Sequence, residues 1–368
     1  MVNKLLELAE ENLKQQLPFV LYKKPKEKKF KGVFQKDDHL NSVKSFKEKG
    51  FVFAPFDTSN PIILIEPDLV LENPIDFKAL ESKSSIGDEV TDTTEKERYT
   101  DLVSKAVEKI RSNAFKKVVL SRKAEVPFSK SPILLFKNLI NSYDNAFCYL
   151  WYHPKVGMWL GATPEILVKR KGMGFITMSL AGTQAFNSEQ SKPVWSDKEL
   201  DEQQLVTDYI HDSIMPKTRN LEISAIENVR AGALWHLRTK ISGQLSDNNF
   251  GELVAKLHPT PAVCGLPLEY SKKFILENEK YDRSFYTGYL GELNFKEERT
   301  RNTNRRNTEN SAYKTVSTTS ELYVNLRCLQ LVNNKAVIYV GGGITKESDP
   351  LKEWQETVYK SCTMLNIL

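Results

Sequence analysis

The sequence predicts a globular protein of antiparallel strands and helices, and three observations lead to this prediction. Its 368 residues exceed a typical single domain but are few for three, so one two-lobed domain or two domains are expected. Hydrophobic residues make up 40% of the chain and charged residues 27%, which excludes a disordered or fibrous protein. Short apolar segments follow one another with few helical patterns between them, and this order favours antiparallel pairing.

The N-terminal part of the chain is expected to hold one helix and several strands. Apolar residues at helical spacing predict an amphipathic helix over residues 4–16. Two strand-like segments flank the lysine-rich turn of FVLYKKPKEKKFKGVFQ, and GFVFAPF and PIILIEPDLVLE are further strand candidates. The polar segment from Ser82 to Glu97 is typical of a surface connection, so we place a loose boundary there.

Helices and strands are both expected beyond that boundary. The helical patterns cover YTDLVSKAVEKIRS and residues 132–142, 198–214 and 249–257. The strand patterns are KKVVLSRKAEV, AFCYLWYH, VGMWLGATP and EILVKRK. Strands in such close succession pair most simply with their neighbours in sequence.

Residues 295–320, FKEERTRNTNRRNTENSAYKTVSTTS, differ from the rest of the chain. They are rich in Asn, Thr and Arg and almost free of apolar residues, so this segment cannot bury a core. We expect a mobile inserted loop between the strand ending in YLGELNF and the strand starting with ELYVNLRCLQL. A basic loop could contact RNA, but no aromatic residues interleave its charges.

Composition restricts the class of partner and the compartment. The net charge of +5 suits an anionic metabolite and does not require nucleic acid. The four cysteines are far apart and show no CxxC spacing, which argues against a zinc site or a disulfide framework and favours reduced cytosolic thiols. Acidic residues interrupt the start of the chain, and no apolar run approaches the length of a membrane span. A cytoplasmic protein with no membrane partner is therefore expected.

The segment SDPLKEWQETVYK predicts a terminal helix with an ordered arrangement of charges. Asp349 and Pro350 are favourable at a helix start, because Asp accepts a first-turn bond and Pro needs no donor. Five apolar residues share one face: Leu351, Trp354, Val358, Cys362 and Leu365. Glu353, Glu356 and Lys360 fall on the opposite face, which by itself is typical of a solvated surface with a Glu–Lys pair.

The 198–214 helix repeats this acidic pattern. Glu199 and Glu202 are three residues apart, so two helices each presenting a glutamate pair could meet over one divalent cation. A hard, oxygen-only ligand set suits Mg²⁺, whereas the simpler interpretation is a solvated acidic face. The glycines of AVIYVGGGITKESDP would let backbone N–H groups approach an anion, but the segment matches neither nucleotide-binding pattern.

Five segments taken together carry a family resemblance. They are KVVLSR at 117–122, GATPEILV at 161–168, LWHL at 234–237, HPTPAVCGLP at 258–267, and NLRC at 325–328 followed by the glycines and EWQETVYK. With them the sequence resembles the chorismate-utilising enzymes, and within these the isochorismate synthases, over roughly residues 100–368. The resemblance implies an α+β fold of antiparallel β-sheets packed against outer helices in two lobes. Residues 1–97 would complete one lobe, and residues 98–368 would form the chorismate-binding catalytic domain.

The resemblance also implies roles for individual residues. The family's general base, which acts on water, maps onto Lys117, and its general acid maps onto Glu165. The carboxylates for Mg²⁺ would be Glu202 and Glu356, with Glu353 close by or acting through water. The residues that would hold substrate carboxylates or line the pocket are Lys360, Arg327, Gly341, His236, Ala262, Gly182 and Thr183.

This chain departs from the family pattern beside the first metal ligand. The family usually has acid-His-acid there, whereas Gln203 and Gln204 follow Glu202 in this chain, which leaves the surroundings of the metal open. The 295–320 segment is a second departure.

The implied activity is isochorismate synthase, the Mg²⁺-dependent isomerisation of chorismate by water addition at C2 and loss of the C4 hydroxyl, with no organic cofactor. It would feed menaquinone or siderophore biosynthesis, and nothing in the sequence demands an oligomer. A lysine serves as base only if its pKa is lowered, and a glutamate as acid only if its pKa is raised. A salicylate synthase is the close alternative, although such enzymes tend to carry a hydroxyl residue where this chain has Ala262.

Two further alternatives are weighed against this activity. Anthranilate and aminodeoxychorismate synthases are disfavoured, because their relatives carry a GAPK-like segment where this chain has CGLP. From a different class, the alternative is a catalytically silent protein that binds RNA through the basic 295–320 segment.

Overall fold

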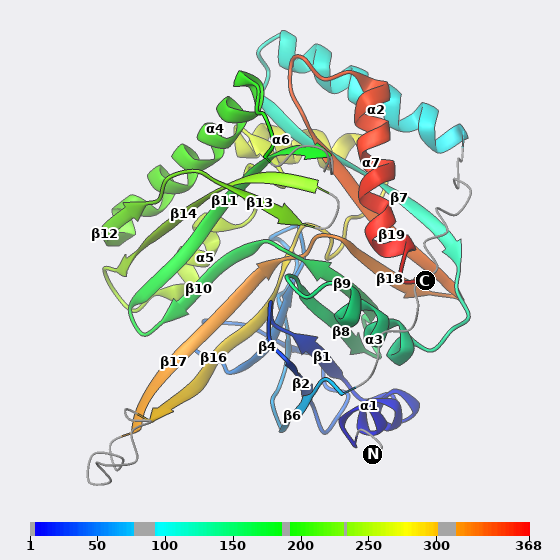
Figure 1. Ribbon diagram of the computed structural model, residues 1–368, viewed down its shortest axis with the longest axis vertical. Helices are drawn as coiled ribbons and strands as arrows, with labels where there is room; N and C mark the ends of the chain where they lie inside the picture. The colour runs from blue at the N-terminus through cyan, green and yellow to red at the C-terminus, as the bar shows by residue number, and fades with distance from the viewer. Residues whose placement is uncertain (1–3, 77–92, 186–191, 232–233, 301–313) are drawn as a thin grey trace.

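The protein is built on two large antiparallel sheets with helices on their outer faces (Figure 1). A computed structural model describes residues 4–76, 93–185, 192–231, 234–300 and 314–368. Neighbouring strands in both sheets run antiparallel. The predicted α+β class is therefore confirmed.

The first sheet has nine strands. In spatial order they are β15 (Gly265–Leu266), β7 (Lys117–Pro127), β19 (Lys335–Ile344), β18 (Cys328–Val332), β9 (Gly157–Thr163), β8 (Phe147–His153), β1 (Phe19–Lys23), β2 (Lys29–Phe34) and β6 (Leu69–Pro74).

The second sheet has ten strands, nine in one path and a tenth beside it. In spatial order they are β12 (Thr218–Ile223), β14 (Leu234–Leu245), β11 (Gly174–Ala185), β10 (Ile166–Lys171), β17 (Lys314–Val324), β16 (Tyr289–Thr300), β4 (Gly50–Ala54), β5 (Ile63–Ile65) and β3 (Asn41–Ser42), with β13 (Glu227–Ala231) also pairing with β14. Residues before the predicted boundary supply strands to both sheets.

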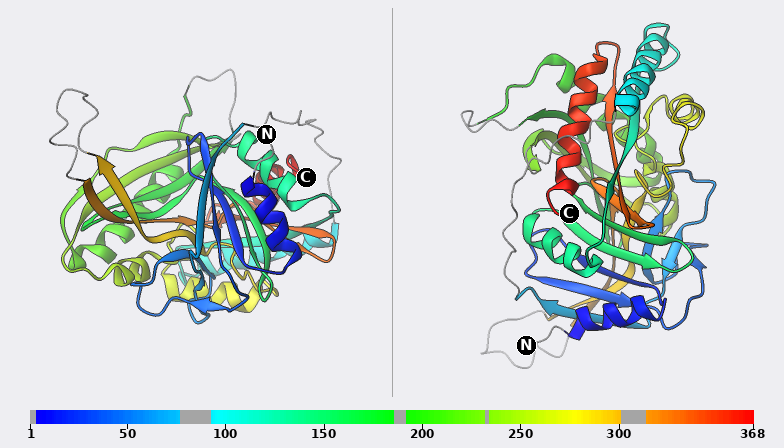
Figure 2. Two further views of the ribbon diagram at one scale, coloured as in Figure 1. Left: turned by 90° about the horizontal axis from the view of Figure 1, so that it is seen from below. Right: turned by 90° about the vertical axis from the view of Figure 1, so that its right-hand side faces the viewer.

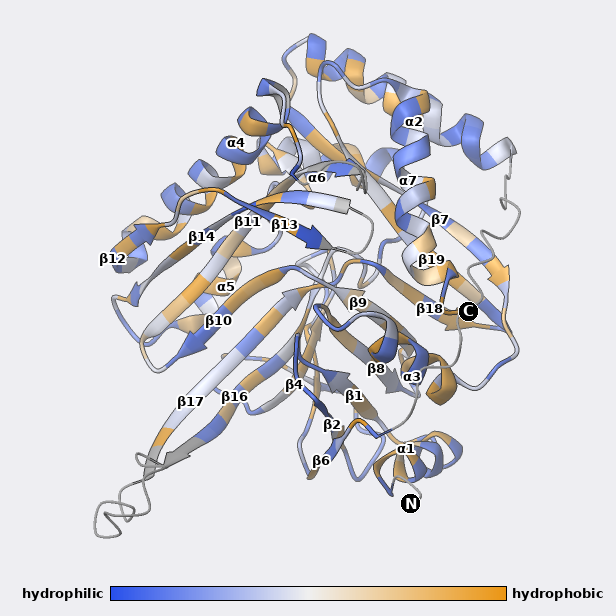
Figure 3. Cartoon of the chain, viewed as in Figure 1, coloured by the Kyte–Doolittle hydropathy of each residue, from blue (hydrophilic) through white to orange (hydrophobic). Residues whose placement is uncertain are grey.

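Helices cover the outer faces of the sheets. They are α1 (Lys4–Lys14), α2 (Thr93–Arg111), α3 (Pro132–Ser142), α4 (Asp197–Ile214), α5 (Phe250–Leu257), α6 (Leu268–Asn278) and α7 (Pro350–Leu365). Helix α4 packs on β11, and α7 packs on β19 with α2 beside it, as Figures 1 and 2 show. Hydrophilic and hydrophobic segments alternate along α2 and α4 in Figure 3, as expected for helices with one face on a sheet. No described helix is long and apolar enough to cross a membrane.

Aromatic side chains from both sheets fill the space between them. Phe53 of the second sheet lies 5.1 Å from Trp151 of the first, measured between ring centroids. Phe147 and Tyr323, again from opposite sheets, stack at 4.2 Å. These rings belong to one buried cluster, so the two sheets share a core instead of forming separate domains there.

Part of the 295–320 prediction is wrong. Strand β16 continues to Thr300 and β17 begins at Lys314, and the two pair in register from Phe295 opposite Thr319 to Thr300 opposite Lys314. This hairpin projects from the second sheet at the lower left of Figure 1. Its Thr, Ser and Val residues suit a strand, and strands solvated on both faces need no apolar alternation. Residues 301–313 lie outside the described part.

Two other predictions about local structure need correction. The segment ELYVNLRCLQL, predicted to continue one strand, instead forms the end of β17 in the second sheet and most of β18 in the first. The faces of the terminal helix were also misassigned, because Leu351 is 61% exposed whereas Glu353 is buried at 7%. Strands β11 and β14, helix α6 and the short strands beside β14 were not predicted at all.

Gly291 is the first point at which the fold can be tested. It lies in β16 at a φ of +147°, and a methyl group on its Cα would lie 2.0 Å from the main-chain oxygen of Glu321 in β17. We expect Gly291→Ala to lower the free energy of unfolding by about 3 kcal/mol, because the paired strand would have to move. Chemical denaturation measures this.

Gly172→Ala is the matched control for this prediction. Gly172 also has a positive φ, +58°, but no atom lies within 4 Å of the added methyl group. Only the backbone strain remains, so a loss of about 1 kcal/mol is expected. Equal losses in the two variants would show that close packing at Gly291 does not matter.

Candidate active site

A cavity between the two sheets gathers the site residues expected from the sequence. Its walls come from β7 and β19 of the first sheet, β11 and β14 of the second, and helices α4 and α7. The expected residues that line it are Lys117, Glu165, Gly182, Glu202, His236, Ala262, Arg327, Gly341, Glu353, Glu356 and Lys360. Thr183 belongs to β11, but its side chain lies outside the described part of the structure.

Lys117 and Glu202 form an ion pair that joins opposite walls of the cavity. Lys117 is the first residue of β7 and is 3% exposed, and its Nζ lies 2.7 Å from Oε1 of Glu202 on α4. A methyl group at Gly343 would lie 3.1 Å from Lys117 Cε and 3.2 Å from that carboxylate oxygen. The missing side chain of Gly343 therefore leaves room for this pair.

Glu165 lies in the cavity as a neutral acid. It sits between β9 and β10, is 4% exposed, and its amide donates to Oγ1 of Thr163 at 3.2 Å. Burial raises the pKa of Glu165 to about 8, and the positive charges of Lys117 and Arg327 oppose this rise only in part. Its carboxyl group is thus mostly protonated at neutral pH, as a proton donor requires.

Arg327 and His236 form a second polar group in the cavity. His236 Nδ1 lies 3.1 Å from the carbonyl oxygen of Gly182, and its Nε2 lies 3.2 Å from Nη2 of Arg327. Because the guanidinium can only donate, Nε2 accepts and Nδ1 donates, which is the neutral form of imidazole. Burial, together with the charges of Arg327 and Lys360, lowers the pKa of His236 to about 3.

Arg327 itself remains cationic at neutral pH. Burial lowers its pKa to about 10, still well above the working range of most enzymes. Its φ of +49° lies in the left-handed region, at the sharp link where the chain passes from β17 to β18. The link places a buried cation where it can bind a carboxylate.

The acidic face of α7 turns toward the first sheet, not toward solvent. Lys360 Nζ lies 2.7 Å from Glu356 Oε1 and donates to the carbonyl oxygen of Gly341 at 3.0 Å. Glu353 Oε1 accepts a 2.6 Å bond from Ser348 Oγ. A methyl group at Gly342 would lie 3.2 Å from Glu353 Oε2 and 3.8 Å from Glu356 Oε1.

The donor chemistry of these carboxylates fits a hard divalent cation. Glu353 and Glu356 approach Gly342 while Glu202 approaches Gly343, and all three carboxylates line the same cavity. Within the described ranges, however, no three His, Cys, Asp or Glu side chains are already close enough to hold a metal ion. Lysine ammonium groups instead neutralise Glu202 and Glu356.

The two glutamines that depart from the family pattern do not line the cavity. Gln203 is fully buried, and its amide donates to Ser179 Oγ at 2.8 Å and to Thr239 Oγ1 at 3.2 Å, which ties α4 to β11 and β14. Gln204 donates to Asp208 on the exposed side of α4. The departure therefore affects how α4 is seated on the sheet.

Sequence reasoning missed part of the cavity wall. Val119, Val263, Tyr286 and Thr287 all line it. Val119 lies two residues beyond Lys117 on the same face of β7, so strand alternation could have identified it. The segment with Tyr286 and Thr287 shows no helical or strand periodicity that would have singled it out.

The raised pKa of Glu165 predicts how stability depends on pH. Between its ordinary value of 4.5 and the folded-state value of about 8, the folded protein keeps a proton that the unfolded chain releases. Glu165 therefore makes the folded state less stable as pH rises through this window. Glutamine cannot ionise, so the Glu165→Gln variant escapes this loss. The free energy of unfolding of the variant minus that of the unmodified protein should therefore rise by about a few kcal/mol between about pH 5 and about pH 8.

Urea unfolding of both proteins at the two pH values measures this difference. The same stability difference at both would mean that Glu165 is ionised in the folded protein.

Known proteins resemble this chain over most of its length. The isochorismate synthase DhbC of Bacillus subtilis (strain 168) is 28% identical over 338 residues, 86% of this chain and 79% of the relative. The isochorismate synthase MenF of Escherichia coli (strain K12) is 29% identical over 284 residues, 74% of this chain and 61% of the relative.

A solved structure and a family model agree with these relatives. The crystal structure of a putative 2,3-dihydroxybenzoate-specific isochorismate synthase, DhbC from Bacillus anthracis, matches with a TM-score of 0.78 and 25% identity and covers 99% of both chains. The model of the chorismate binding enzyme family matches residues 70–299 and 313–368. This match spans most of the chain and includes all the residues that line the cavity. The chain therefore belongs to the chorismate binding enzyme family.

Proposed function

We propose that the protein is a Mg²⁺-dependent isochorismate synthase, an isomerase that moves the hydroxyl group of chorismate from C4 to C2. The observation that carries this proposal is the pairing of a buried lysine and a buried neutral glutamic acid in one cavity. Lys117 can accept a proton from water and Glu165 can donate one to a leaving hydroxyl group. One water is consumed at C2 and one is released from C4, so the reaction balances.

Lys117 would act as the general base. In the described structure its ammonium is paired with Glu202, and it must lose a proton before it can take one from water. Its burial at 3% exposure leaves it accessible only to groups inside the cavity. A water held beside Nζ would then be deprotonated as it attacks C2.

Glu165 would act as the general acid. Hydroxide is a poor leaving group, so departure from C4 requires a proton donor that still carries its proton near neutral pH. The pKa of about 8 gives Glu165 this property, and its low exposure keeps competing water away. The same residue as an ordinary surface glutamate would be ionised.

Cations in the cavity would hold the two carboxylates of chorismate. Arg327 offers Nη donors, and Lys360 is poised above Gly341. Neutral His236 occupies one side of Arg327 and so limits the directions from which a carboxylate can approach it. Glu202, Glu353 and Glu356 would hold Mg²⁺, which supplies positive charge against a substrate carboxylate.

The product distinguishes this proposal from its rivals. The protein is incubated with chorismate and Mg²⁺ near neutral pH, and the products are separated by chromatography. We expect a mixture of chorismate and isochorismate with little salicylate, because the methyl group of Ala262 cannot donate the hydrogen bond that a hydroxyl residue would offer. Added ammonium should give no amino product. Lys117→Ala should lower kcat by about 100-fold or more.

Steady accumulation of salicylate and pyruvate would support the salicylate synthase alternative. Near-normal hydroxyl transfer in Lys117→Ala would exclude Lys117 as the base.

The metal assignment is tested separately. Glu202→Gln and Glu356→Gln should each weaken Mg²⁺ binding by about 10-fold or more and abolish turnover at modest Mg²⁺, since an amide is a poor replacement for a carboxylate on a hard dication. Calorimetric titration and turnover against Mg²⁺ concentration give the two readouts.

Glu125→Gln is the matched control for the metal assignment. Glu125 lies on β7, the strand of Lys117, but it is exposed and paired with Lys335 at 3.0 Å. It should leave both readouts unchanged. Unaltered Mg²⁺ affinity in both cavity variants would remove Glu202 and Glu356 from the metal site.

A further inference from the structure

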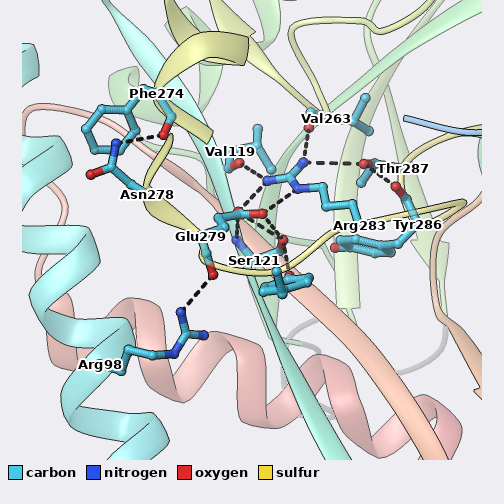
Figure 4. Close-up of polar contacts among 11 residues, drawn as sticks. Arg98, Val119, Ser121, Val263, Phe274, Asn278, Glu279, Arg283, Tyr286 and Thr287 are labelled. Carbon is cyan, nitrogen blue, oxygen red and sulfur yellow. Dashed lines mark hydrogen bonds and ion pairs between the residues drawn. The ribbon is translucent and has the colours of Figure 1, made fainter. Parts of the chain in front are cut away.

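A buried ion pair, Glu279 with Arg283, contacts residues that line the cavity, and Figure 4 shows these contacts. Glu279 follows α6 and Arg283 comes four residues later, and they are 1% and 2% exposed. Arg283 Nη2 lies 2.6 Å from Glu279 Oε1, and Nε lies 2.7 Å from Oε2, so the two groups face each other through a pair of bonds. Neither residue is among those that line the cavity.

The remaining donors of Arg283 bind three residues that do line the cavity. Nη2 donates to the carbonyl oxygen of Val119 at 2.6 Å, and Nη1 donates to the carbonyl oxygen of Val263 at 3.1 Å and to Oγ1 of Thr287 at 3.3 Å. With the two bonds to Glu279, all five N–H donors of the guanidinium are used. No other side chain can supply five donors in this plane.

Together the two side chains replace a missing part of the first sheet. Strand β15 pairs with only the first two residues of β7, and its ladder ends where the amide of Val119 donates to the carbonyl oxygen of Cys264 at 2.9 Å. Beyond that point Arg283 satisfies the carbonyl oxygen of Val119. Glu279 Oε1 satisfies the amide of Ser121 at 2.7 Å. The edge of β7 is thus closed by side chains instead of by a neighbouring strand.

We infer that the Glu279–Arg283 pair positions the general base relative to the other walls of the active site. This inference rests on the proposed function. One guanidinium fixes the strand that carries Lys117 to the walls that contain Val263 and Thr287. Arg283 touches no substrate, so it is a positioning residue and not a catalytic one.

Arg283→Lys separates positioning from substrate binding. Lysine keeps the positive charge beside Glu279 but offers three donors at most. It therefore cannot replace all the hydrogen bonds of the guanidinium to Val119, Val263 and Thr287. The cations that would bind substrate carboxylates, Arg327 and Lys360, lie on other segments and make no bond to Arg283. We therefore expect kcat to fall by about 10- to 100-fold while KM for chorismate changes by less than about 3-fold.

Glu292→Gln is the matched control. Glu292 is also buried, at 2% exposure, and binds Tyr22 at 2.5 Å and Lys24 at 2.6 Å, away from the cavity. Both variants disturb a buried ionic group and should lower Tm. Only Arg283→Lys should lower kcat, measured at a temperature at which both proteins remain folded. Equal effects of the two variants on kcat would overturn the inference.

Hydrogen exchange gives a readout that does not depend on turnover. Peptides that span residues 117–123 and 260–266 should exchange faster in Arg283→Lys and not in Glu292→Gln, because the former loses bonds to both segments. If Arg283→Lys does not fold, Glu279→Gln keeps an acceptor for Ser121 and is measured instead.

The possible failures are distinguishable. If the unmodified protein does not turn over chorismate, the proposed function fails. Hydrogen exchange then still tests whether Arg283 holds β7 against the other walls of the cavity. Unchanged exchange in both peptides of the folded variant would overturn the inference whatever the activity.

Discussion

Two adjacent glycines of β19, Gly342 and Gly343, are the constraint on which the candidate active site depends. Gly342 leaves space that Glu353 and Glu356 approach, and Gly343 leaves space for Lys117 beside Glu202. Any larger residue at these positions would crowd the charged side chains that α4 and α7 direct at the sheet. These two glycines are therefore explained by the room they leave for charged side chains beside the strand, whereas the sequence pattern had suggested backbone contact with an anion.

Burial decides what each titratable group in the cavity can do. It keeps Glu165 protonated and His236 neutral, while Arg327 retains its charge because guanidinium starts from a far higher pKa. An acid, a neutral imidazole and a fixed cation thus coexist within one cavity at neutral pH. The same three side chains in water would include an ionised glutamate, so the fold and not residue type alone creates this combination.

The sequence predicted local structure and motif residues well, but not how distant segments meet. Helix α3 was placed correctly because its apolar spacing is regular and Pro132 marks its start. The solvated hairpin of β16 and β17 was missed because polar strands lack alternation. Apolar spacing alone put Glu353 on a solvated face, because it cannot show that Gly342 leaves room for a carboxylate beside the sheet, and only the family resemblance placed Glu353 near a cation. Arg283 was missed because its partners are main-chain groups of residues remote in sequence.

The proposed function gives Lys117 two roles that cannot be filled at the same time. As an ammonium it is the counter-ion of the Glu202 carboxylate, 2.7 Å away in the cavity. As a general base it would have to release a proton, and this release would leave the Glu202 carboxylate without its counter-ion. Glu202 then needs another cation before Lys117 can act. This requirement of charge balance, independent of any family pattern, is a physical reason for including a divalent cation in the proposed function.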